Sequence, residues 1–114
     1  MKNERQLARN LPIEIQIPNG KPVLDPFYAR VGLGHDLKWS ANPTDSWIIS
    51  FRDKRTPLEG VFVVKGQGNV VEGGPHVVKH DGHFRYAIAV ARMRDGGLPP
   101  EMFIDADCPE IIVY

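Results

Sequence analysis

The chain has 114 residues, which is enough for one hydrophobic core and too few for two domains of ordinary size. Hydrophobic residues make up 42% and charged residues 25%, a balance typical of globular proteins that excludes a wholly disordered chain. Fourteen basic residues balance fourteen acidic ones, so no net positive field would attract nucleic acid or an anionic membrane. We therefore expect neither nucleic acid nor a membrane as a partner.

The first residues carry charges with no apolar run behind them, so the sequence as given shows no secretory signal peptide. The single cysteine, Cys108, excludes an internal disulfide framework and fits a reducing compartment. A cytoplasmic location is the resulting expectation, unless a leader has been removed.

The sequence divides into a short N-terminal region and one long domain. Residues 1–11 are mostly polar, and we expect them to form a flexible arm before a β-sandwich domain at residues 12–114. From Ile13 to Ile17 isoleucine alternates with polar residues, which is the period of a strand with one buried face.

The middle of the chain, from Val31 to Phe51, reads as a strand, a polar loop and a second strand. In the second strand Trp47, Ile49 and Phe51 would share one face, whereas Ile48 would point the other way. Burying these three large side chains would contribute roughly 1.5 to 3 kcal/mol each, so this strand should lie at the centre of the core.

Two further segments follow. The apolar run from Val61 to Val64 predicts a central strand covered on both faces. The glycine-rich stretch from Gly66 to Gly74 lacks the Lys and Ser or Thr of a phosphate loop, so we expect a loose connection there.

The Asp81-Gly82 pair is the preferred sequence for a two-residue hairpin turn. It predicts a hairpin between residues 77–79 and 84–90, with His80 opposite His83. The following strand would alternate between a large apolar face and a face of small residues. The large face comprises Phe84, Tyr86, Ile88 and Val90, and the small face Arg85, Ala87, Ala89 and Ala91.

Residues 92–110 contain repeated Gly and Pro and predict an irregular region, and residues 110–114 predict a final strand. The whole pattern gives about seven or eight short strands separated by turns. It predicts an all-β, single-domain Greek-key β-sandwich.

Two pieces of the chain resemble the cupredoxin family, the small β-sandwiches that include plastocyanin. In the first, Gly34, Asp36, Trp39 and Asn42 match a strand and an Asn-containing loop, and Trp47 stands where a copper-binding His is expected. An immunoglobulin-like sandwich remains the alternative fold.

The second piece matches the family's run of a glycine and alternating aromatics before its cysteine ligand. Here Gly82, Phe84 and Tyr86 precede Ile88, which stands at the cysteine position. A blue-copper centre needs a thiolate and two imidazoles. The resemblance therefore implies a cupredoxin-like fold without the copper ligands, and we expect no cofactor.

The histidines near the predicted hairpin turn are the one cluster of metal-ligand type. His80 and His83 would lie on one face with Cβ atoms about 5 Å apart, and could share a zinc or copper ion. His76 would lie about 13 Å further along the strand. Because two ligands are fewer than a structural zinc site needs, an exposed tip with titrating histidines is the favoured interpretation.

The small residues Ala87, Ala89 and Ala91 would let another layer approach the sheet closely. The chain's own N-terminal segment is the favoured covering layer, and the alternative is a second copy in a homo-oligomer or an unknown protein partner. Overall, we expect a non-catalytic binding or structural module rather than an enzyme. The alternatives are a metal-binding protein using His80 and His83, or a small enzyme whose site is not visible in the sequence.

Overall fold

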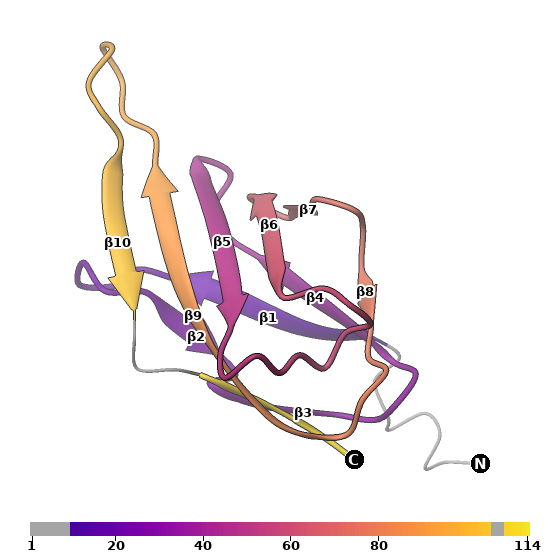
Figure 1. The fold of residues 1–114 in the computed structure, drawn as a ribbon. Helices are drawn as coiled ribbons and strands as arrows, with labels where there is room; N and C mark the ends of the chain where they lie inside the picture. Colours follow the sequence, from indigo (N-terminus) through magenta and orange to yellow (C-terminus); the bar gives the residue numbers. More distant parts are fainter. Residues whose placement is uncertain (1–9, 106–108) are drawn as a thin grey trace, which may run out of the picture.

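The computed structural model describes residues 10–105 and 109–114, which form two β-sheets packed face to face (Figure 1). All of the regular secondary structure in these residues is extended. The strands in chain order are β1 (Asn10–Gln16), β2 (Val23–Asp25), β3 (Tyr28–Val31), β4 (Asp36–Ser40), β5 (Asp45–Phe51), β6 (Val63–Gln67), β7 (Val70–Val71), β8 (His76–Val77), β9 (Gly82–Arg92), β10 (Glu101–Asp105) and β11 (Glu110–Val113).

The smaller sheet has the order β2-β1-β4-β8, and β1 runs parallel to β4. The larger sheet has the order β3-β11-β9-β5-β6-β7, and β3 runs parallel to β11. The long strand β9 also pairs with β10, which lies beside its second half. In Figure 1 the strands of the smaller sheet cross behind those of the larger sheet. This arrangement confirms the predicted all-β sandwich, although the described residues form eleven strands instead of the expected seven or eight.

The inner faces of the two sheets meet in an aromatic cluster. Trp39, from β4 of the smaller sheet, is fully buried and contacts Tyr86 edge-on at a centroid distance of 6.0 Å. Phe51 and Trp47 of β5 lie 6.3 and 6.4 Å from the same indole. Because aromatic rings bury large areas and favour such tilted contacts, this cluster holds the two sheets together.

The alternation predicted for β5 and β9 is confirmed. The side chains of Trp47, Ile49 and Phe51 are buried, while Ile48 is 40% exposed on the opposite face. The larger side chains of β9 face the core in the same way. These buried residues are Phe84, Tyr86, Ile88 and Val90.

The hairpin predicted around Asp81-Gly82 is wrong. The segment before the turn contributes β8, which pairs with β4 of the smaller sheet, and β9 starts at Gly82 opposite Val113 of β11. Asp81 therefore lies in the connection between the two sheets, and Gly82 is the first residue of β9. Local turn preference is outweighed here by the burial that each flanking segment gains in its own sheet.

Three other boundaries differ from the sequence prediction. The run from Val61 to Val64 is not a strand covered on both sides, because β6 begins at Val63 and the outer face of its sheet is open. The stretch expected to be loose contains the end of β6 and all of β7. Strand β10 lies inside the region expected to be irregular.

The first strand begins earlier than the predicted start of the domain at residue 12. Strand β1 begins at Asn10, so residues 10 and 11 belong to the smaller sheet, while the rest of the expected arm lies outside the described residues. Among the described residues, no helix is long and apolar enough to cross a membrane.

Candidate functional site

The positions that align with copper ligands lie on the inner face of the larger sheet. Trp47 is 3% exposed and Ile88 is 1% exposed. Trp47 pairs with Val90 and Ile49 pairs with Ile88, so Trp47 and Ile88 are diagonal neighbours on adjacent strands. The Trp47 indole donates a hydrogen bond from Nε1 to the carbonyl oxygen of Gly68 at 3.0 Å. These two positions therefore supply an indole and a hydrocarbon chain to the core.

The histidines expected to share a metal ion lie next to different carboxylates. His80 Nε2 lies 3.2 Å from a carboxylate oxygen of Glu59, and His83 Nδ1 lies 3.3 Å from one of Glu110. Their expected cross-strand pairing is not formed, because His83 is opposite Ile112. Within residues 10–105 and 109–114, no group of three or more His, Cys, Asp or Glu side chains could hold a metal ion. Cys108 lies outside the described residues.

Asp45 is the buried carboxylate at the start of β5. Both of its oxygens accept hydrogen bonds from Arg92, from Nε at 2.8 Å and from Nη2 at 2.9 Å. The bound carboxylate raises the pKa of Arg92, mainly through these hydrogen bonds. The pair fastens β5 to the end of β9, and the Asp45 carboxylate is fully engaged in that role.

The predicted small-residue face lies on the outside of the larger sheet. Ala87, Ala89 and Ala91 are half-buried and form a furrow along β9. The strand registers place Met102 and Ile104 of β10 next to this furrow on one side. Ile48 of β5 lies beside it on the other side. We call these six residues the alanine face.

The large members of the alanine face are exposed. Ile104 is 71% exposed, Met102 61% and Ile48 40%. Two hollows of about 270 and 150 Å³ lie on this face, and Ile48 and Ala89 contribute to both. The sequence prediction missed Met102 and Ile104, although the short apolar run that they form with Phe103 was the signal that could have revealed β10.

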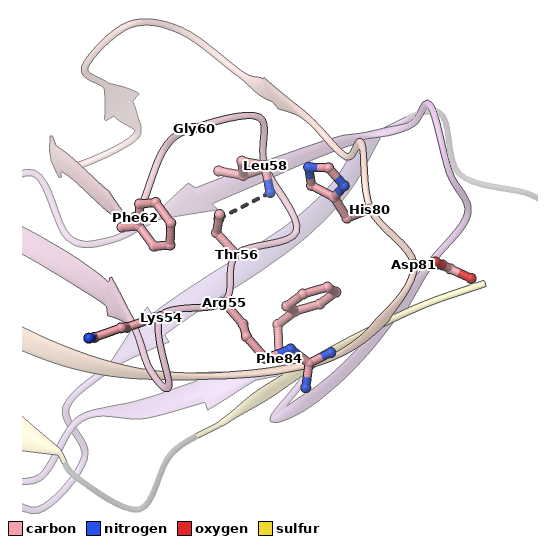
Figure 2. A pocket seen from close by; sticks show the side chains of 9 residues that line it. All are labelled: Lys54, Arg55, Thr56, Leu58, Gly60, Phe62, His80, Asp81 and Phe84. Atoms are coloured by element: carbon pink, nitrogen blue, oxygen red, sulfur yellow. Dashed lines mark hydrogen bonds between the residues drawn. The ribbon is translucent and has the colours of Figure 1, made fainter.

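A second candidate site is a cleft at the other end of β5, between the loop at residues 52–62 and the chain entering β9 (Figure 2). Its volume is about 430 Å³. It combines cationic groups with apolar ones. The main contributors are Lys54, Arg55, Leu58, Phe62, His80 and Phe84. Of these, the sequence proposed His80 as a possible metal ligand and placed Phe84 on the buried face of its strand. It did not bring either next to Arg55, because the loop and the strand meet through tertiary folding.

Arg55 is the cation of this cleft whose side chain is held by a contact with an aromatic ring. The centre of its guanidinium group lies over the Phe84 ring, 5.1 Å from the centroid. The two carboxylates that precede and follow it in the loop have other neighbours: Asp53 lies 3.1 Å from Arg85 and Glu59 lies next to His80. In the described part of the chain, Arg55 makes no ion pair with a carboxylate.

Comparisons with protein-family models, with curated proteins and with solved structures found no match to this chain. No family is assigned on that basis, so the proposals below rest on the alanine face and on the cleft that contains Arg55.

Proposed function

We propose that this chain is a non-catalytic β-sandwich module that binds a second copy of itself through the alanine face. The observation that carries this proposal is the difference between the outer faces of the two sheets. On the smaller sheet, exposed or half-buried polar residues such as Glu14, Gln16 and Lys38 face outward. On the larger sheet, the outward positions of the alanine face form an open apolar patch beside polar residues such as Ser50 and Lys65, and such a patch is typical of a protein interface.

The charge on the alanine face favours an identical partner. The six residues are all uncharged, and the neighbouring Lys65 of β6 lies 3.8 Å from a carboxylate oxygen of Glu72. When two identical surfaces meet about a two-fold axis, any unpaired charge near the axis faces its own copy. A neutral surface avoids that repulsion.

The shape of the alanine face is also complementary to a second copy of itself. The side chains of Met102 and Ile104 stand next to the furrow formed by the three alanines. In a two-fold arrangement, such a ridge on one copy can fill the furrow of the other, and the reverse contact forms at the same time.

The open edge of β10 is a less suitable contact. Among the described strands, β10 pairs only with β9. If β10 paired antiparallel with its copy over its full length, Glu101 of one chain would lie opposite Asp105 of the other. Like charges directly opposite each other destabilise a strand pair, so the face is favoured over the edge.

The size of the face predicts a weak, reversible dimer. Counting β6, which adds Val63, four strands about 4.8 Å apart and five residues of about 3.4 Å rise give a footprint of roughly 320 Å². Two such footprints total roughly 650 Å², which is below the ~1,200–2,000 Å² of stable complexes.

We further propose that the sandwich is cupredoxin-like, with a core of hydrocarbon and aromatic rings in place of a copper site. The burial of Trp47 next to Ile88 supports this, because these are the two positions at which the resemblance expects ligands. Consecutive strands that change sheet, such as β2 to β3 and β4 to β5, support a Greek-key connection.

Sedimentation velocity from about 10 µM to about 1 mM protein tests self-association. We expect the weight-average sedimentation coefficient of the parent protein to rise over this range. Ala89→Arg should abolish the rise, because two guanidinium groups would enter one apolar contact and weaken it by at least about tenfold. Ile104→Glu, on a mostly exposed side chain, should do the same.

Val23→Arg is the matched control, since it places the same charge on an exposed apolar residue of the smaller sheet. It should associate like the parent. A parent protein that stays monomeric throughout the range, or an Ala89→Arg variant that associates as well as the parent, would overturn the proposal.

A further inference from the structure

The cleft beside β9 has a feature that self-association does not use: a cation that makes no ion pair within residues 10–105 and 109–114 and lies against the ring of Phe84. We propose that this cleft binds a small aromatic carboxylate, with Arg55 holding the carboxylate group. The site shares no residue with the alanine face, so this proposal stands independently of dimer formation.

The charges around the cleft favour an anion. Lys54 and Arg55 both line it, and Asp81 is the one acidic side chain among the described residues that does so. In Figure 2 the Asp81 carboxylate points away from the centre of the cleft, whereas the Arg55 guanidinium lies beside Phe84. His80 Nε2 lies 3.2 Å from a carboxylate oxygen of Glu59. The Lys54 ammonium group also points away from the centre of the cleft in Figure 2, so Arg55 is the cation that a ligand there would meet.

The position of Arg55 suits a carboxylate in particular. Its guanidinium carbon lies over the ring of Phe84, which restrains the side chain by a cation–π contact. A guanidinium group binds carboxylates through two parallel N–H donors on one edge. Since a cation–π contact uses none of the N–H donors of the guanidinium group, those donors remain open to an anion in the cleft.

The rest of the lining suits an aromatic ring. Phe62 is 45% exposed, and it projects into the cleft from the loop while Phe84 projects from β9 (Figure 2). Leu58 adds a fully buried apolar floor. The volume of about 430 Å³ lies within the ~300–1,000 Å³ that small-molecule sites occupy. A single ring with one carboxylate would meet both the apolar walls and the cation.

The walls of the cleft are fixed in place before a ligand arrives. The Thr56 hydroxyl accepts a hydrogen bond from the Leu58 amide at 3.1 Å and donates one to the Val61 carbonyl, so it closes the loop on itself. The amides of Lys79 and His80 donate to the Pro57 carbonyl at 2.8 and 3.1 Å, which ties the two walls together. Preorganised walls lower the entropy lost on binding.

The test is a titration of the ¹⁵N-labelled full chain with benzoate, followed by amide chemical shifts. We expect saturable shifts at residues 54–62 and 80–84, with a dissociation constant on the order of 1 mM for so small a ligand. Benzamide, which keeps the ring without the charge, and acetate, which keeps the charge without the ring, should each bind at least about tenfold more weakly.

Arg55→Gln should weaken benzoate binding at least about tenfold, because it removes the charge and the paired N–H donors while leaving a shorter polar side chain. Arg30→Gln is the matched control, since Arg30 is an exposed cation on β3 that does not line the cleft, and it should bind benzoate like the parent. The amide spectrum of each variant also reports whether it is folded, and Phe62→Ala gives a second variant on an exposed side chain.

Equal binding of benzamide and benzoate would overturn the proposal. So would benzoate binding that is unchanged in both Arg55→Gln and Phe62→Ala, or shifts spread over the surface without saturation, which would show non-specific association only.

Discussion

Tyr86 lies in the aromatic cluster where the inner faces of the two sheets meet. Its ring is fully buried among Trp39 and Phe51, and its hydroxyl accepts a hydrogen bond from Trp39 Nε1 at 3.4 Å. Burial raises the pKa of the phenol well above its ordinary value of 10.0, the hydrogen bond from Trp39 lowers it, and the nearby Asp105 raises it further. The phenol therefore stays protonated in the folded protein under alkaline conditions that ionise it in the unfolded chain.

This difference predicts how stability depends on pH. Below pH 10 the folded and unfolded chains both hold the Tyr86 proton, and its effect on stability is constant. Above about pH 10 the unfolded chain releases the proton while the folded chain keeps it, so the free energy of unfolding falls by about 1.4 kcal/mol per pH unit from this group.

Tyr86→Phe should remove that component. Urea unfolding at several values between about pH 8 and pH 11 should give a shallower decline for the variant than for the parent. Near neutral pH the variant should lose about 1 kcal/mol, because Trp39 Nε1 loses its acceptor. Parallel curves for the two proteins would contradict the role assigned to the buried phenol.

At the residue scale, the sequence predicted which side chains of β5 and β9 are buried. Alternation along a strand fixes the face of each residue once one face is buried, so Trp47 and Tyr86 were correctly assigned to the core. It could not predict the bidentate pairing of Arg92 with Asp45, because 47 positions separate the two in sequence and the contact depends on the strand register.

At the scale of elements, sequence patterns identified some strands correctly and led to errors at others. Strong alternation identified β5 and β9, whereas Asp81-Gly82 led to a wrong hairpin because the turn preference is local. Strand β10 was missed because its five residues stand close to a run of Gly and Pro.

Gly66 takes part in a contact between β5 and β6 that no local sequence pattern revealed. It was assigned to a loose connection, yet it lies in β6 opposite Trp47 of β5. A Cβ atom at Gly66 would fall 2.7 Å from Cε2 of Trp47 and 2.5 Å from the Val70 carbonyl oxygen. The glycine therefore leaves the space that the indole occupies when it reaches the Gly68 carbonyl.

Gly66→Ala should destabilise the protein by about 1–3 kcal/mol, because the methyl group would force the Trp47 ring or the β6–β7 backbone to move. Urea unfolding followed by tryptophan fluorescence measures the loss. Gly32→Ala is the control, since its added Cβ would make ordinary contacts of 3.5 Å with the His35 ring. A Gly66→Ala variant as stable as Gly32→Ala would show that the indole does not depend on this space.

At the scale of the whole molecule, composition and turn spacing were enough to predict an all-β sandwich, and the two sheets confirm it. The alanine face was partly predictable, because Ala87, Ala89 and Ala91 repeat at the period of a strand. Its flanks on β10 and the cleft around Arg55 were not, because both arise from segments that meet only in the folded chain.

The central claim is that two copies meet through the alanine face. The most direct measurement is a filtered NOE experiment on a mixture of ¹³C-labelled and unlabelled chains at about 1 mM, where a weak dimer is populated. We predict intermolecular contacts from the Ala89 methyl group to the Met102 or Ile104 methyl groups of the other copy. Intermolecular contacts confined to the smaller sheet, or none at a concentration where sedimentation shows a dimer, would contradict this account.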